Sequence, residues 1–184
     1  MTLVEVMVAT GSASIVLIGI MLIYLASLKM SSAGNAQLCV QSRARQGLDR
    51  ILYDIRKAED AVIYSSYLGP TNADAGAYLV AQFPTNIVVF PDQPYHHYYI
   101  GNIKALSSGV TNGTLYFFTS LDGITLPATN THVELIRGVT NPNQVFDWIN
   151  GVVNINIRVA DENDVDGKQI IFLRSAVAFR NKAN

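Results

Sequence analysis

The apolar residues of this chain are concentrated at its N-terminus. Between Glu5 and Lys29 lie 23 residues, 6–28, without a charged side chain. At about 1.5 Å of rise per residue, a helix of that length crosses a hydrocarbon layer of about 30 Å. The pattern therefore predicts a helix that is long enough to span a membrane.

Behind this segment the pattern becomes that of an amphipathic helix. Apolar side chains recur at intervals of three and four residues, at Leu48, Ile51, Leu52, Ile55, Ala58 and Val62. This spacing puts them on one helix face. The first proline is Pro70, so no earlier residue forbids a single long helix. We expect a continuous helix with a hydrophobic part at 1–28 and an amphipathic part at 29–64.

After residue 64 the pattern favours β-structure. Turn-forming residues fill 69–76, and runs rich in β-branched and aromatic side chains follow. The expected strands are 78–83, 87–90, 95–100, 114–119, 132–139, 152–160 and 169–179. Gly, Asn, Pro and Asp separate them, which favours an antiparallel sheet over alternating βαβ units. The predicted fold class is α+β, with a β-rich head at 65–184.

Composition and charge exclude several classes of protein. Hydrophobic residues make up 49% of the chain and charged residues 15%, which is too apolar for a disordered chain. The 13 basic and 14 acidic residues form no block of one sign, so we expect no general nucleic-acid binding. Cys39 is the only cysteine, which excludes an intrachain disulfide and a multi-cysteine zinc site.

The apolar N-terminus has one explanation other than a membrane anchor, and an anchor has two possible orientations. A secretory signal peptide begins with positive charge and has a shorter apolar core, whereas the first charge here is Glu5 and no Lys or Arg precedes Lys29. For an anchor, the positive-inside rule would put the rest of the chain in the cytoplasm. That expectation reverses if a basic leader is removed from in front of Met1.

The first residues resemble a known family. Met1-Thr2-Leu3-Val4-Glu5, followed by an uncharged run and an amphipathic helix, is similar to the mature N-terminus of the type IV pilin and pseudopilin superfamily. Thr2, Leu3 and Glu5 match the family pattern, and Met1 stands where phenylalanine is the commonest residue. Residues 45–58 and 175–181 are similar to those of the larger minor pilins and pseudopilins. This second similarity extends the resemblance to the rest of the chain.

The resemblance implies an assembly mechanism. In the family, Glu5 of an incoming subunit pairs with the N-terminal amine of a subunit already in the filament, so Met1, Thr2, Leu3 and Glu5 are the expected assembly residues. It also implies processing at Met1 by a prepilin peptidase and N-methylation there. The expected partners are further copies of the chain, the inner membrane before assembly, and the pilus assembly machinery. The expected location is an extracellular filament, and no cofactor is expected.

Physical chemistry also singles out Glu5 and the small residues behind it. A carboxylate at the edge of an apolar spanning segment needs a positive partner, either its own helix N-terminus or the terminal amine of another chain. The alternative is that Glu5 lies among lipid headgroups. Small side chains allow close approach of helices, so we expect helix-packing contacts at Ala9, Gly11, Ser12 and Gly19. Their alternative explanation is the ordinary tolerance of glycine in spanning helices.

The other candidate sites have simpler explanations. Glu162, Asp164 and Asp166 resemble half of a calcium loop, but Leu173 stands where the bidentate glutamate belongs, and Asp166-Gly167 also suits a hairpin turn. His96 and His97 are adjacent and point to opposite faces of a strand, so an exposed aromatic strand or subunit contact is expected there instead of a metal site. Asn112-Gly113-Thr114 fits a glycosylation sequon, and a hairpin turn is the favoured interpretation.

The sequence therefore predicts a structural filament subunit. The alternatives are a minor pilin or pseudopilin of a secretion or DNA-uptake system, and a membrane-anchored binding module such as an adhesin. An enzyme is not expected, because Cys39 is remote from the histidines and no nucleophile, base and orienting group can be named. The sequence does not choose among adhesion, motility, DNA uptake and secretion.

Overall fold

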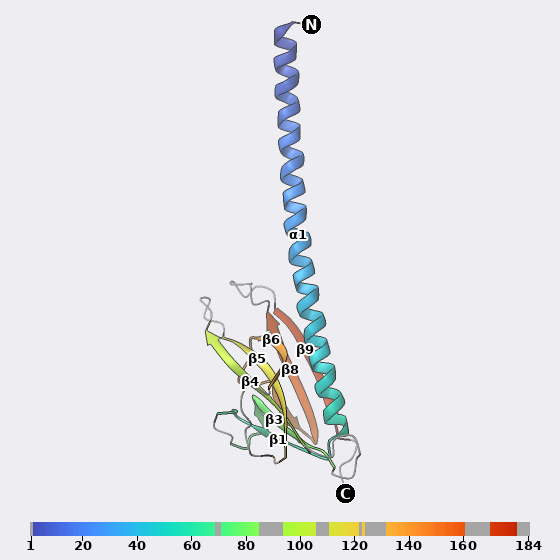
Figure 1. Ribbon diagram of the computed structural model, residues 1–184, viewed down its shortest axis with the longest axis vertical. Helices are drawn as coiled ribbons and strands as arrows, with labels where there is room; N and C mark the ends of the chain where they lie inside the picture. The colour runs from blue at the N-terminus through green and yellow to red at the C-terminus, as the bar shows by residue number, and fades with distance from the viewer. Residues whose placement is uncertain are drawn as a thin grey trace. The chain divides into compact units, whose positions relative to one another are not determined.

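The computed structural model describes residues 2–68, 71–84, 94–105, 111–121, 123, 132–160 and 170–179, and it has the predicted α+β class (Figure 1). The chain begins with one helix of 55 residues, α1 (Leu3–Lys57). The strands follow in the order β1 (Asp60–Tyr64), β2 (Ala75–Gly76), β3 (Tyr78–Gln82), β4 (Tyr95–Ala105), β5 (Thr111–Ser120), β6 (Val133–Val139), β7 (Phe146–Ile149), β8 (Val152–Ala160) and β9 (Ile170–Ala178).

The chain divides into two compact units between Cys39 and Val40. The described part of the first unit consists of residues 3–39 of helix α1 and the residue before them, and all of these residues are exposed except for the partly buried Gly19 and Ala36. It contains a window with a mean hydropathy of 2.4, of which 0% is buried, so by length and composition it can cross a membrane. The second unit contains the rest of α1 and all the strands.

The strands of the second unit form one nine-stranded sheet in the described residues, and every pairing is antiparallel. Its order is β1-β3-β4-β5-β6-β8-β7-β2, with β9 on β8. Strands β6 and β8 are paired through a single register pair, Val139 with Val159. The sheet is therefore built from two groups of strands, β1-β3-β4-β5-β6 and β8-β7-β2 with β9. They meet at β6 and β8, and again beside β1, where Ala73 N–H donates to Ile63 O at 3.0 Å and Ala77 N–H donates to Ser65 O at 3.3 Å.

Residues 44–55 of α1 pack on one face of this sheet. Their apolar stripe has the spacing expected from the sequence, and its buried members are Ala44, Gly47, Leu48, Ile51, Leu52 and Ile55. The stripe belongs to one core cluster with side chains from both groups of strands, including Leu79, Leu115, Ile155 and Leu173. This packing confirms the prediction that the rear part of the helix is amphipathic.

The opposite face of the sheet carries a second, aromatic cluster. Its buried members are Tyr78, Val80, Tyr99, Tyr116 and Phe118, with Tyr64, Tyr67 and Tyr95 packed against them. Tyr67 lies over Tyr99 with 3.8 Å between ring centroids. Both faces of β3, of residues 96–100 of β4 and of residues 113–118 of β5 are consequently covered, whereas residues 102–105 of β4 are exposed.

The predicted helix end at residue 64 is wrong, because α1 ends at Lys57. Ala58 N–H still bonds to the helix carbonyl of Asp54 at 3.1 Å, but Glu59 N–H donates to Gln82 O at 2.8 Å and joins the sheet. Residues 60–64 then pair with β3 as β1. Val62 is 37% exposed and does not continue the buried helix stripe. The spacing of Val62 from the helix stripe is a coincidence, because residues 60–64 form a strand that pairs with β3.

Other strand predictions differ in smaller ways. The short strands β2 and β7 were not expected, because they lie in segments rich in Ala, Gly, Asn and Asp. Asn112 and Gly113 do not form a hairpin turn, because they lie in β5, where Asn112 pairs with Lys104 and Gly113 with Val139. The predicted strand at 87–90 lies outside the described residues.

Gly47 is the position where α1 approaches β6 most closely among its glycines. A Cβ atom there would lie 2.5 Å from Ile136 Cγ1 and 3.1 Å from the carbonyl oxygen of Leu135. The lack of a side chain at residue 47 thus fixes the distance between the helix and this strand. In contrast, a Cβ atom at Gly34 of the same helix would have no neighbour within 4 Å.

We predict that Gly47→Ala lowers the free energy of unfolding of the second unit. The clash costs about 1–3 kcal/mol and outweighs the gain of about 1 kcal/mol in helix propensity. Urea unfolding of the full chain in detergent micelles, followed by the fluorescence of Trp148, measures this change. Gly34→Ala is the control and should not lower the midpoint; equal stability of Gly47→Ala and the unmodified chain would contradict the close contact.

Candidate functional site

The start of α1 forms a capping box, in which two residues satisfy each other's backbone groups. Thr2 N–H donates to Glu5 Oε2 at 2.8 Å, and Glu5 N–H lies 3.4 Å from Thr2 Oγ1. The carboxylate also lies in the first turn, where the helix dipole favours negative charge. The sequence contained this signal, since Thr2 and Glu5 have the Thr-x-x-Glu spacing of a capping box, and our sequence analysis missed it.

The structure thus brings two of the four predicted assembly residues together. Thr2 and Glu5 are in contact, and the Leu3 side chain is 79% exposed. Met1, including its proposed processing and N-methylation, lies outside the described residues. Glu5 remains the only charged side chain between residues 2 and 28. Its partner within the chain is a neutral amide, so its charge has no counter-ion in the described part of that segment.

The predicted helix-packing residues lie on open surface. Ala9, Gly11 and Ser12 are exposed, and Cβ atoms built at Gly11 and Gly19 would meet nothing within 4 Å. These glycines are therefore not required by contacts within the chain.

The hydroxyl groups of this segment are satisfied by the helix itself. Thr10 Oγ1 donates to Val6 O at 2.9 Å, Ser12 Oγ to Ala9 O at 3.0 Å, and Ser14 Oγ to Thr10 O at 2.8 Å. An apolar environment requires such internal partners for polar groups. The polar residues are thus compatible with either lipid or helix neighbours.

The histidine strand is buried, so the expected exposed aromatic strand or subunit contact at 95–99 is wrong. His96 is 1% exposed and His97 0%. The two side chains do point to opposite faces, as the strand geometry predicts. Both faces are covered, one by α1 and the other by the aromatic cluster, and this double burial could not be inferred from the strand alone.

On the helix side, a buried carboxylate joins α1 to β4. Asp54 is 5% exposed, and its Oδ2 accepts hydrogen bonds from His96 Nδ1 at 3.2 Å and from the Tyr98 hydroxyl. Burial raises the pKa of Tyr98 well above its usual value, and the negative charge of Asp54 raises it further. Because a buried carboxylate with two donors has a strict geometry, this contact fixes the position of the helix on the strand.

On the other face, His97 links three strands. Its Nδ1 is 2.7 Å from the Tyr78 hydroxyl, and its Nε2 is 2.7 Å from the hydroxyl of Ser120. His97 also stacks on Phe118 with 4.3 Å between centroids. His132 lies nearby and is hydrogen bonded to Tyr99. His97 and His132 thus take part in packing and hydrogen bonding inside the second unit.

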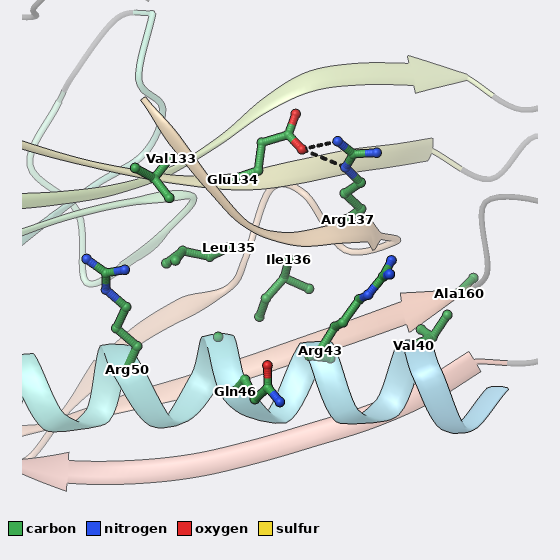
Figure 2. A pocket seen from close by; sticks show the side chains of 12 residues that line it. Val40, Arg43, Gln46, Arg50, Val133, Glu134, Leu135, Ile136, Arg137 and Ala160 are labelled. Atoms are coloured by element: carbon green, nitrogen blue, oxygen red, sulfur yellow. Dashed lines mark hydrogen bonds and ion pairs between the residues drawn. The ribbon is translucent and has the colours of Figure 1, made fainter. Parts of the chain in front are cut away.

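A groove of about 640 Å³ lies between α1 and β6 (Figure 2). Arg43 and Arg50 reach it from the helix and Arg137 from the strand. Arg137 Nε donates to Glu134 Oε2 at 2.6 Å, and the Arg50 guanidinium lies 4.4 Å from the centroid of the Phe117 ring. Three guanidinium groups and one carboxylate give the groove positive charge, but its lining residues include no Ser, Thr, Cys, His, Lys or Asp.

The remaining candidates do not form a chemical site in the described residues. Cys39 is exposed on α1, and among the residues that the structure describes no three His, Cys, Asp or Glu side chains come together as metal ligands. Glu162, Asp164 and Asp166 lie outside the described residues, so the calcium hypothesis and the hairpin turn at Asp166-Gly167 stay predictions. The described geometry therefore offers packing surfaces and grooves, without a reactive centre.

Comparisons of the chain with family models, with curated proteins and with solved structures find no match. The architecture itself is type IV pilin-like, since one long apolar N-terminal helix is followed by an antiparallel sheet that packs on its rear part.

We predict that Asp54→Ala destabilises the second unit by about 3 kcal/mol, because it removes the buried acceptor shared by His96 and Tyr98. Asp49→Ala, an exposed aspartate on the same helix, is the matched control and should change stability by less than about 0.5 kcal/mol. Urea unfolding followed by Trp148 fluorescence compares the two. Similar small losses in both variants would show that the buried network does not hold the helix.

Alkaline pH should also destabilise this unit. The raised pKa of Tyr98 means that the folded state keeps its proton where the unfolded state loses it. The associated stability is complete below the usual tyrosine pKa of 10.0 and falls as the pH rises from there towards the folded pKa. The slope for one tyrosine reaches about 1.4 kcal/mol per pH unit. Urea titrations between pH 8 and 11 should show this decline, and Tyr98→Phe should make it shallower; an unchanged slope in that variant would assign the decline to other groups.

Proposed function

We propose that the protein is a structural subunit of an extracellular type IV pilus-like filament, which polymerises through the hydrophobic part of α1. Before assembly the same helix holds the subunit in the inner membrane. A prepilin peptidase exposes and N-methylates Met1, and the pilus assembly machinery transfers the helix from lipid into the filament.

The observation that carries this proposal is the uncovered apolar surface of α1. Among the residues that the structure describes, nothing buries the most apolar window, and large side chains such as Ile15, Leu17 and Ile23 are 66–74% exposed. Water does not tolerate a continuous apolar surface of this length. Lipid tails and neighbouring copies of the helix both exclude water, so the same apolar surface of α1 is buried in the anchored and in the assembled state.

Glu5 supports polymerisation more specifically than the apolar surface does. The Thr2 amide gives its carboxylate a hydrogen bond at 2.8 Å but no positive charge. When lipid or other helices surround the start of α1, a carboxylate without a counter-ion is costly. The N-terminal amine of a neighbouring subunit supplies that charge, and a pair of this kind sets the axial register between copies.

The open surface at the small residues supports close helix packing in the filament. The Cβ positions at Gly11 and Gly19 face unoccupied space. Small residues at such positions let a neighbouring backbone approach and replace lost lipid contacts with helix contacts. Ala9 and Ser12 are exposed in the same segment of the helix.

We predict that Glu5→Gln stops filament assembly while membrane insertion stays intact. Glutamine can still accept the hydrogen bond of a capping box, so this variant removes only the charge. The lost ion pair, worth about 3 kcal/mol or more when buried, corresponds to more than about a hundredfold weaker association between subunits. Electron microscopy of extracellular filaments and membrane fractionation measure the two properties.

Thr2→Val is the matched variant, because it removes the hydroxyl cap and keeps the charge of Glu5. It should assemble filaments at close to the normal yield. The opposite result, with assembly by Glu5→Gln and failure by Thr2→Val, would reduce Glu5 to a capping residue and contradict the proposed pairing. Sequencing the N-terminus of the main filament protein should return Met1, and its abundance there distinguishes a major subunit from a minor one.

A further inference from the structure

A second groove, of about 450 Å³, lies on the side of β8 and β9 turned away from the helix-covered core. Residues of β8 alternate between the two sides: Ile155 and Ile157 are buried in the core, and Asn156 and Arg158 project from the other side. On β9 their register partners are Arg174 and Phe172. The strand pairing thus brings these four side chains onto one outer surface, to which the 141–147 segment adds Asn141, Gln144 and Asp147.

Hydrogen bonds hold the polar part of this groove in place. Asp147 Oδ2 accepts from Asn156 Nδ2 at 3.0 Å, and Asp147 Oδ1 accepts from Gln144 Nε2 at 3.3 Å. Asn141 Nδ2 donates to the Asn156 carbonyl at 2.7 Å, and its Oδ1 accepts from the Arg158 N–H at 2.8 Å. Each side-chain amide nitrogen has two N–H groups, and a carboxylate has further lone pairs. Asp147, Asn156 and Gln144 therefore retain donors and acceptors for a ligand in a fixed arrangement.

An exposed aromatic ring borders these polar groups. Phe172 is 61% exposed in the middle of a strand, and the Arg158 guanidinium lies 5.4 Å from its ring centroid. A large apolar side chain does not gain stability in this position. Next to amides and a carboxylate, it offers a flat surface for the apolar face of a ligand.

The charges of the groove favour an acidic ligand. Its charged lining residues are Arg158, Arg174 and Asp147, so guanidinium groups exceed carboxylates by one. The two amide donors of Asp147 use part of the hydrogen-bonding capacity of its carboxylate and leave its charge in place. Arg174 stands across the strand pair from Asn156 and presents a guanidinium fork, which matches a carboxylate geometrically.

We propose that this groove binds a saccharide that carries a carboxylate group. A pyranose ring has hydroxyl groups that both donate and accept, and these match the amide and carboxylate pairs of Gln144, Asp147 and Asn156. The C–H face of the ring stacks on Phe172, and the sugar carboxylate pairs with Arg174. Inorganic phosphate or a simple acidic peptide would use the arginines but leave the ring and the amides without a role.

The experiment is calorimetric titration of the full chain in micelles of a detergent without a sugar headgroup. The acidic probes are 3′-sialyllactose and trigalacturonic acid, and their uncharged counterparts are the methyl esters of both. Sodium phosphate and a pentaglutamate peptide test the two other anion classes. Because the titration uses unassembled protein, its result does not depend on the proposed polymerisation.

At least one acidic saccharide should bind at least about tenfold more tightly than its uncharged counterpart. Phe172→Ala should weaken that binding about tenfold or more, whereas Ile149→Ala, which removes an exposed apolar side chain outside the groove, should not change it. Arg174→Ala should abolish the preference for the acidic form, and Arg45→Ala should keep it.

Four results would overturn the proposal. They are the absence of binding by both acidic saccharides, equal binding of charged and uncharged forms, binding that is unchanged in Phe172→Ala and Arg174→Ala, and binding of phosphate or pentaglutamate as tight as that of the saccharides.

Discussion

The removal of apolar surface from water is the constraint on which this molecule depends, and one helix meets it in two ways. Behind residue 40, the stripe at 44–55 is buried by the sheet of the same chain. In front of residue 29, none of the apolar window is buried by the part of the chain that the structure describes. Folding therefore buries the apolar surface of the rear part of α1, whereas the apolar surface of the front part needs lipid or other helices to cover it. The fold and the proposed function follow from this difference along one continuous element.

Apolar burial alone does not define how the helix is seated on the sheet. Asp54 supplies direction, because its carboxylate receives donors from two residues of β4. Gly47 supplies distance, because the Ile136 side chain of β6 lies where a Cβ atom at residue 47 would be. A polar contact and a missing side chain, two turns apart, thus give the helix a defined position. Larger apolar contacts contribute more stability but tolerate more displacement.

Much of the fold was predictable because it depends on local periodicity. The long helix, the apolar stripe and strands such as β8 followed from spacings of three to four and of two. The helix end did not, because Val62 fits both periods and only the pairing of β1 with β3 decides between them. The burial of His96 and His97 depends on what covers each face, which no strand pattern contains. For the candidate assembly site, the contact of Thr2 with Glu5 was readable from the Thr-x-x-Glu spacing. The need of Glu5 for a positive partner was also readable, but which group supplies that charge depends on the surroundings of the helix and not on a spacing within it.

The position of α1 across both groups of strands has a consequence for folding. The two groups are hydrogen bonded where β6 meets β8 and also beside β1, where Ala73 and Ala77 donate to Ile63 and Ser65. The core cluster contains side chains of α1 together with residues of both groups. The helix therefore adds packing that couples the two groups and contributes to their cooperative unfolding. Since α1 leaves the ribosome before any strand, the helix surface on which the strands pack is already synthesised when the first hairpin forms.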